Sequence, residues 1–352
     1  MSQVNVDRSS YDSLWDTRLS IDLGGSGVTL DLRQWVNSGL MTFFFFVVGL
    51  EARREFDLGE LRERRRFALP LLAGVGGMAA AVAIYLASNA GRSSASGWGI
   101  AMSTDTAFAL GLLALVGPRF PQRLRAFMLT VVVVDDLVAL VVIATVYTES
   151  LRVVPLVAAI AFFAAVVLAR RLGVRGGLVY ALLGAAAWVG LLKSGVEPVV
   201  VGLAIGLLAY AFPAPRSDLE RATDRFREFR EQPTAELARM AEVELRAATS
   251  LNERLQHLFH PWTSYVVVPV FALANAGIAI DGTLLARGFS SPITLGILFG
   301  YVVGKPLGIF GSSWLLTRLS GARLRALRSE CPASPPRARA RRRRASRSGA
   351  IP

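Results

Sequence analysis

Long apolar runs separated by short charged segments are the main pattern along this chain of 352 residues. A helix needs about 20 mostly apolar residues to cross a bilayer. Nine runs of suitable length begin near Trp35, Phe67, Gly97, Ala126, Val153, Gly177, Pro198, Trp262 and Pro292. The alternating strand-length segments of a membrane barrel are absent from the sequence. The pattern predicts an all-α integral membrane protein, a polytopic helical bundle over residues 35–318.

The charged connections predict how the spans are oriented, because Lys and Arg collect in cytoplasmic loops. Loops with little positive charge are residues 89–96, 148–152, 194–197 and 281–291. They alternate with basic loops that contain Arg53, Arg54, Arg62, Arg64, Arg65, Arg66, Arg119, Arg123, Arg125, Arg170, Arg171 and Arg175. We therefore expect a multi-pass protein of the cytoplasmic (inner) membrane of a bacterium, with the polar arm at residues 1–34 on the extracytoplasmic side.

Two further segments are expected on the cytoplasmic side. Residues 216–261 form a charged insertion in which apolar residues recur at three- and four-residue spacing between Leu237 and Leu258, as in an amphipathic helix. We interpret it as a helical insertion lying against the bundle, with a regulatory role as the alternative. Residues 319–352 are rich in Arg, Ala, Pro and Ser, a composition typical of a disordered tail. Binding to anionic membrane lipid and an out-of-frame origin are alternatives for this tail.

Composition supports a membrane protein, since 53% of the residues are hydrophobic and only 18% are charged. The net charge of +13 is concentrated in the tail, where ten arginines from Ala322 onward accompany one acid, Glu330. A nucleic-acid partner is therefore not indicated. The first apolar run is followed by charged residues rather than by a small-residue cleavage site. We expect that run to stay in the protein as a span.

Two adjacent acids lie in the middle of one predicted span. Asp135 and Asp136 follow four consecutive valines in the run that begins near Ala126. A charge at bilayer centre costs roughly several kcal/mol, so an acid at this depth is a functional candidate. Neighbours on a helix point about 100° apart, which predicts a different surrounding for each carboxylate. The structural alternative is a pair of acids that caps or pairs within the bundle.

Two more ionisable residues lie within predicted spans. Asp105 belongs to the polar cluster at residues 103–106, whose side chains compete for backbone hydrogen bonds and favour a broken helix that can coordinate ions. The alternative is a polar patch for helix packing. Lys305 lies near the middle of the last span, before Pro306, and unlike arginine it can lose its proton. A permanent ion pair with one of the aspartates is the alternative there, and it does not exclude function.

Carboxylates with one lysine suit the exchange of a cation for protons, because Na⁺ and protons bind the same carboxylate oxygens. Copper and zinc sites are disfavoured, since no His or Cys lies within a predicted span. Coupled acids titrate together, which predicts a steep dependence on pH. An organic-anion transporter is disfavoured by the acidic character of the site. No cofactor is expected beyond the transported ions, Na⁺ or Li⁺ and H⁺.

Several motifs, in order along the chain, resemble those of the NhaA family of sodium/proton antiporters. They are residues 43–51 (FFFFVVGLE), 97–111 (GWGI through STDTAFALG), 135–137 (DDL), 192–196 (LKSGV), 260–262 (HPW), 271–277 (FALANAG) and 304–308 (GKPLG). The resemblance runs from about Leu14 to Arg318. It implies a bundle with two interlaced broken helices, electrogenic and pH-regulated export of sodium or lithium against external protons, contact with membrane lipid, and a homodimer as a candidate assembly.

The resemblance also implies roles for individual residues. Asp136 is similar to the family's main carboxylate for binding the cation and protons, and Asp135 lies beside it. Lys305 is similar to the partner whose proton affinity responds to sodium. Thr104 and Asp105 match the unwound part of a broken helix, where Asp105 offsets the helix-end dipoles. The positions that the family links to pH sensing are Glu51, Arg54, Glu55, His257 and His260. Gln256 stands where some members have an acid.

The resemblance has limits at both ends of the sequence. The family has one more span before the arm at residues 1–34 and two more after the ninth span, including the second broken helix. We therefore expect an NhaA-like fold that is incomplete at both ends. The alternative to antiport is a truncated, transport-inactive homologue or a frameshift product.

Overall fold

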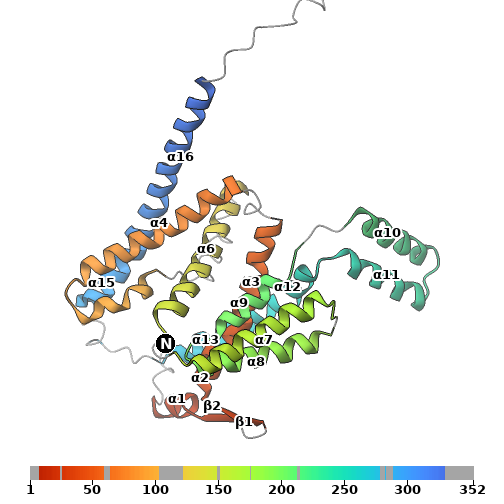
Figure 1. Ribbon diagram of the computed structural model, residues 1–352, viewed down its shortest axis with the longest axis horizontal. Coiled ribbons are helices and arrows are strands. Elements are labelled where there is room, and N and C mark those ends of the chain that lie inside the picture. Colours follow the sequence, from red (N-terminus) through yellow and green to blue (C-terminus); the bar gives the residue numbers. More distant parts are fainter. Residues whose placement is uncertain are drawn as a thin grey trace, which may run out of the picture.

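Helices account for nearly all of the regular structure, as the apolar runs predict (Figure 1). The computed structural model describes residues 8–23, 26–58, 64–102, 122–148, 151–174, 176–211, 215–277, 282 and 288–329. The predicted all-α membrane bundle is confirmed for this part of the chain. Thr104 and Asp105, and the tail from residue 330 onward, lie outside the described residues.

The polar arm contains a short helix and a β-hairpin that the sequence reasoning did not predict. Helix α1 (Arg8–Trp15) precedes strands β1 (Arg18–Leu23) and β2 (Ser26–Asp31), which pair antiparallel with Arg18 opposite Asp31. Asp31 then caps α2 (Leu32–Gln34), because its carboxylate accepts from the backbone N–H of Gln34 and the Gln34 side chain accepts from the N–H of Asp31. The hairpin thus leads directly into the first span.

In the first half of the bundle, helices begin close to the starts of the predicted runs, except that most of the run beginning near Gly97 lies outside the described residues. The elements of this half are η1 (Trp35–Leu40), α3 (Met41–Asp57), α4 (Arg64–Ser88), η3 (Ser93–Ala101), α6 (Gln122–Val146), α7 (Val153–Arg171), α8 (Gly177–Ser194) and α9 (Val199–Leu208). Here η1 is a π-helix that joins α2 to α3 without a break, and η3 is a 3₁₀-helix.

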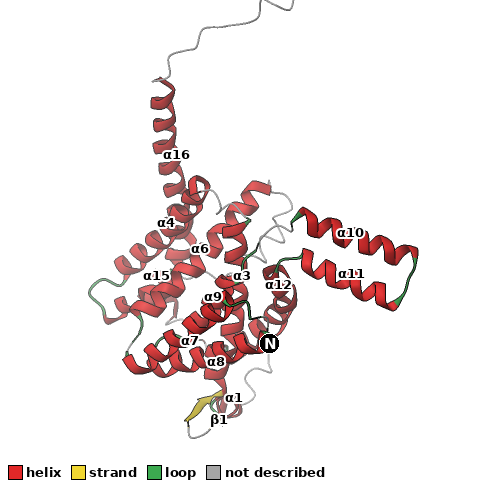
Figure 2. Ribbon diagram, turned by 45° about the vertical axis from the view of Figure 1, so that its right-hand side comes forward, coloured by secondary structure: helices red, strands yellow, loops and turns green. Residues whose placement is uncertain are grey.

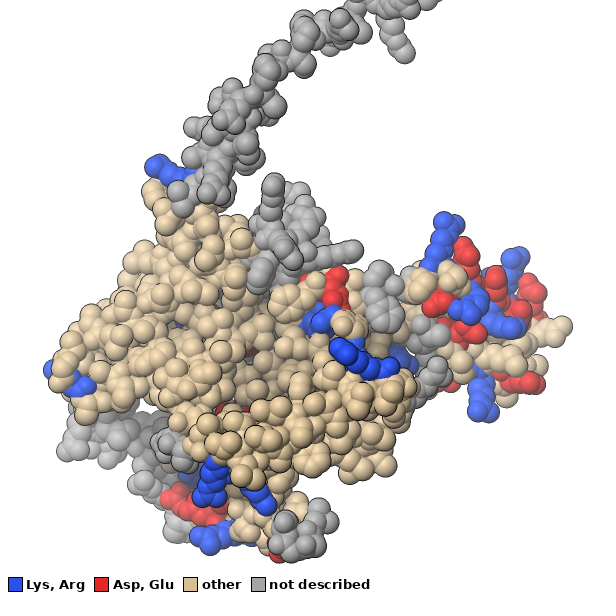
Figure 3. Space-filling model, in the orientation of Figure 1, with Lys and Arg blue, Asp and Glu red and all other residues tan. Residues whose placement is uncertain are grey.

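The second half begins with the charged insertion. Its elements are α10 (Arg216–Glu231), α11 (Ala235–Ala248), α12 (Leu251–Trp262), the π-helix η5 (Thr263–Val267), α13 (Val268–Asn275), α15 (Pro292–Phe299), the π-helix η6 (Gly300–Gly304) and α16 (Lys305–Ser329). Helices α10 and α11 pair with each other and project from the bundle (Figure 2). The interpretation that the insertion lies against the bundle is therefore wrong for these two helices, whereas α12 does pack against α3. Charged side chains gather on this projecting pair and around the arm, while the body of the molecule presents a largely uncharged surface in this view (Figure 3).

Among the described residues, five helical segments are long and apolar enough to cross a membrane. They are Leu32–Asp57, Ala68–Ser88, Val153–Arg171, Gly177–Ser194 and Pro292–Arg318. Apolar α9 is shorter, with 10 residues. Helix α6 has 25 residues and contains both Asp135 and Asp136. These helices confirm that the chain has several membrane-crossing segments, whereas the orientation of each span stays a prediction.

Glycines allow the two closest helix pairs to touch along their backbones. A Cβ atom at Gly206 of α9 would collide with the carbonyl oxygen of Phe46 on α3, and one at Gly308 of α16 would collide with that of Gly76 on α4. Small residues permit such close approach in membrane bundles, where van der Waals packing replaces the hydrophobic effect between helices. Helix α4 also packs against α6, so it lies between the two helices that carry Asp135 and Lys305.

Candidate functional site

A buried ion pair joins α6 to the start of α16. The Lys305 ammonium donates to Asp135 Oδ2 at 2.5 Å, and the two side chains are only 9% and 8% exposed. The sequence left open which aspartate Lys305 meets, and the structure selects Asp135. Both groups are buried, so each loses its hydration at a cost in free energy. Their mutual attraction offsets that desolvation cost.

The π-helix η6 ends immediately before Lys305, which is the first residue of α16. Pro306 has no backbone N–H, and its ring crowds the carbonyl of residue 302, four positions earlier. That position lies inside η6, whose wider turn accommodates the proline within a continuous span. The backbone irregularity therefore lies immediately next to the buried lysine, as is common for π-turns at functional sites.

Asp136 lies next to the pair on α6 but in a different surrounding. Asp135 is buried, whereas Asp136 is half-buried. The difference follows from the rotation of about 100° between consecutive helical residues. One carboxylate of the two is thus held by a lysine, and the other is the more accessible to an incoming ion.

Tyr301 also belongs to this cluster, although the sequence reasoning did not include it. The Lys305 ammonium lies 5.7 Å from the centroid of the Tyr301 ring, and the Tyr301 hydroxyl donates to the Ile100 carbonyl at 2.9 Å. Its position four residues before Lys305 was the available signal, because residues i and i+4 share a helix face.

Two of the residues expected to sense pH, Glu51 and His260, meet where α3 contacts α12. His260 Nε2 lies 4.0 Å from Glu51 Oε1, and Arg54 and Glu55 follow within the next turn of α3. His257 lies elsewhere, in a cleft of about 690 Å³ between α11 and α12. The structure therefore brings Glu51 and His260 together and leaves His257 outside that contact.

Helix α12 is held at this place by a buried amide. Asn252, which has no exposed surface, donates through Nδ2 to the carbonyls of Leu50 at 2.9 Å and of Ala209 at 2.8 Å. Gln256 in turn donates to Asn252 Oδ1 at 2.8 Å. Gln256 stands where some members of the NhaA family have an acid, and in this chain it supports the residue that attaches α12 to the bundle.

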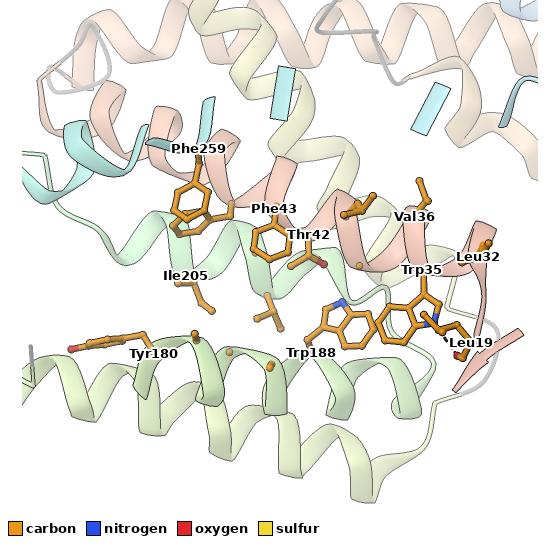
Figure 4. Close-up of a pocket in the computed structure, with 18 of the residues that line it drawn as sticks. Leu19, Leu32, Trp35, Val36, Thr42, Phe43, Tyr180, Trp188, Ile205 and Phe259 are labelled. Carbon is orange, nitrogen blue, oxygen red and sulfur yellow. Dashed lines mark hydrogen bonds between the residues drawn. The ribbon is translucent and has the colours of Figure 1, made fainter. Parts of the chain in front are cut away.

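The large apolar cavity of the bundle is separate from the ion pair. It has a volume of about 660 Å³ and lies between the first span, α8 and α9, with the stacked rings of Trp35 and Trp188 at one end and Phe259 toward the other (Figure 4). Neither Asp135 nor Lys305 lines it. A hard cation needs oxygen ligands, which an apolar lining does not supply. The cavity is therefore not a candidate ion site.

Within the described residues, no group of three or more His, Cys, Asp or Glu side chains could hold a metal ion. Asp135 and Asp136 together supply carboxylate oxygens, the ligand type that sodium prefers. Thr104 and Asp105, which the sequence adds to the site, are not among the described residues.

Comparison with known proteins identifies the family. The family described as "Na+/H+ antiporter 1" matches residues 1–329. The chain is 59% identical over 326 residues to Na(+)/H(+) antiporter NhaA 1 of Salinispora arenicola, which covers 93% of this chain and 50% of the relative. The protein of the same name from Mycolicibacterium gilvum is 44% identical over 309 residues, covering 88% and 50%.

A more distant relative, Na(+)/H(+) antiporter NhaA of Herminiimonas arsenicoxydans, is 41% identical over 318 residues, covering 90% of this chain and 51% of the relative. The chain thus spans about half the length of the curated relatives it matches. The match over residues 1–329 agrees with the resemblance in the motifs and with the apolar helices. The chain belongs to the Na+/H+ antiporter 1 family and is a multi-pass protein of the bacterial inner membrane.

Proposed function

We propose that this chain exchanges Na⁺ or Li⁺ for protons across the membrane, exporting the metal ion as external protons enter. The observation that carries the proposal is the buried Asp135–Lys305 pair with the half-buried Asp136 beside it, within long helices of a membrane bundle. The names of the relatives, Na(+)/H(+) antiporter, support the same activity.

Competition for carboxylate oxygens explains how these residues would couple two ions. Sodium that approaches Asp136 and Asp135 replaces the Lys305 ammonium as the neutralising charge. An ammonium without its carboxylate is unfavourable in a medium of low dielectric constant, so Lys305 then gives its proton to water. Protons arriving from the other side restore the ion pair and expel sodium. When more than one proton is exchanged for each sodium ion, the exchange is electrogenic.

Regulation by pH forms a separate part of the proposal. The contact between Glu51 and His260 joins α3 to α12, far along α3 from the hairpin end of the bundle. The 4.0 Å approach of His260 to the Glu51 carboxylate becomes an ion pair only when the imidazole is protonated. Thr104 and Asp105 complete the proposed ion site.

Ion movement in inside-out membrane vesicles tests the function. Vesicles containing the chain are first acidified inside by respiration, and a fluorescent dye reports the internal pH. Adding NaCl or LiCl should discharge the gradient, because entry of the metal ion releases protons. Asp136→Asn, which keeps the size of the side chain but cannot carry its charge, should abolish the response.

The matched control is Asp224→Asn, the same chemical change at an exposed position of α10, which should leave the response intact. Retention of full exchange by Asp136→Asn would remove that carboxylate from its proposed role. No response of the unaltered chain at any value between about pH 6 and 9, the range around the titration of histidine, would favour the transport-inactive alternative.

A further inference from the structure

Tyrosine hydroxyl groups from three helical segments hold the 3₁₀-helix η3. Tyr85 of α4 donates to the Ser94 carbonyl at 2.8 Å, and Tyr147 after α6 donates to the Ser96 carbonyl at 2.9 Å. Tyr301 of η6 donates to the Ile100 carbonyl at 2.9 Å. The segment that leads along the sequence toward Thr104 and Asp105 is thus fixed to three neighbours at its backbone.

Tyr301 differs from the other two tyrosines because its ring also meets the buried lysine. The Lys305 ammonium lies 5.7 Å from the ring centroid, within the range of about 6 Å in which a cation is attracted to an aromatic face. The same ammonium donates to Asp135 at 2.5 Å. Lys305 therefore has an anionic and an aromatic partner that come from different elements, α6 and η6.

We propose that Tyr301 is a positioning residue for the Asp135–Lys305 pair: its ring holds the Lys305 ammonium in place, and its hydroxyl fixes that ring to the backbone of η3. The aromatic face stabilises the charged lysine without displacing it from the Asp135 carboxylate, because the ring carries no negative charge that would compete with Asp135 for the ammonium. The effect of Tyr301 on transport rests on the proposed sodium/proton exchange. The contact between the Tyr301 ring and the Lys305 ammonium does not depend on that function.

The proposal predicts how the apparent affinity for sodium changes. Sodium must replace the ammonium at Asp135, so any contact that stabilises the ammonium there weakens sodium binding. A desolvated cation–π contact of ordinary strength corresponds to a roughly five- to thirty-fold change in an equilibrium constant. Tyr301→Leu should therefore lower the KM for Na⁺ by about that factor, measured as the sodium concentration that gives half-maximal discharge in inside-out vesicles.

Two variants separate the ring from the hydroxyl. Tyr301→Phe keeps the aromatic face and removes the hydroxyl that donates to the Ile100 carbonyl, so its KM should stay within about three-fold of the unaltered value, a net hydrogen bond being a small term. Tyr147→Phe is the matched control, because it removes hydrogen bonds to the same 3₁₀-helix. Tyr147 follows α6 at roughly 18 Å along the helix axis from Asp135, at about 1.5 Å per residue, and its KM should be unchanged.

A measurement of thermal unfolding tests the contact without transport. The melting temperature in detergent is compared for Tyr301→Leu, Lys305→Met and the double variant. Without the ammonium the ring has no cation to hold, so Tyr301→Leu should lower the melting temperature by about 1–3 °C less in the Lys305→Met background. Tyr147→Phe should give the same shift in both backgrounds. If Tyr301→Leu does not yield folded protein, Tyr301→Met takes its place in both measurements.

The outcomes distinguish this inference from the proposed function. Additive melting shifts for Tyr301 and Lys305 overturn the inference whatever the transport result. An unchanged KM in Tyr301→Leu, an equal fall in Tyr301→Phe, or an equal fall in Tyr147→Phe also overturns it. Coupled melting shifts in a chain that shows no exchange support the contact and reject the transport function instead.

Discussion

Replacing Asp135 by Asn removes one half of the buried ion pair and leaves the Lys305 ammonium without its carboxylate. Both side chains are less than a tenth exposed, so water screens the lost attraction very little. Breaking such a pair costs about 3–5 kcal/mol, because one charge stays buried and uncompensated.

The size of the effect on melting follows from the length of the chain. At about 2.1 cal/mol/K of unfolding entropy per residue, a chain of 352 residues shifts by roughly 1.4 °C for each kcal/mol, so Asp135→Asn should lower the melting temperature by about 4–7 °C. Removing both charges, in Asp135→Asn with Lys305→Met, leaves no unpaired ion and should recover most of that loss. The assay is thermal unfolding of the purified protein in detergent, followed by intrinsic fluorescence at low and high salt. Salt should change the shift little, because buried charges are poorly screened.

Asp224→Asn on exposed α10 is the control for the chemical change itself and should melt like the unaltered chain. Melting of Asp135→Asn within about 1 °C of the unaltered protein would refute this prediction, since the loss of a solvated pair has an effect of that size. The prediction fails equally if the double variant loses as much as both single variants together, because two independent sites would then be involved.

Three further predictions concern the scaffold. Gly206→Leu should prevent the close approach of α9 to α3 and abolish a monodisperse peak in size-exclusion chromatography, whereas Gly311→Leu, where a Cβ meets nothing within 4 Å, should elute normally. Asn252→Ala leaves two backbone carbonyls without their donor and should cost about 1–3 kcal/mol, seen as a lower melting temperature with the secondary structure retained. Burial raises the pKa of the Glu197 carboxyl, in the connection between α8 and α9, above 4.5. Folding therefore favours its protonated form, and its contribution to stability is lost as pH rises through the raised pKa, so Glu197→Gln should raise the melting temperature at about pH 8 and not at about pH 4.

The sequence determined the class of the protein and the residues to examine. Apolar runs of membrane-crossing length and the basic loops between them are local features, so they predict helices and spans without tertiary information. Asp135, Asp136 and Lys305 were identifiable for the same reason, since a charge inside an apolar run is visible in the sequence. The hairpin of β1 and β2 was missed although its signal was present, because apolar residues alternate from Leu19 to Leu30 around Gly24 and Gly25.

Which of these groups meet depends on how the helices pack, and no local pattern in the sequence specifies that packing. Helix rotation and the distance between helices fix whether Lys305 contacts Asp135 or Asp136, and both depend on backbone contacts at glycines such as Gly308 against α4. The approach of Tyr301 to Lys305 and to Ile100 depends on the π-turn before Pro306 and on the packing of η3. These contacts join residues that are far apart along the chain. A periodic pattern identifies the buried face of each helix, but the partner of that face is set by the packing of the whole bundle.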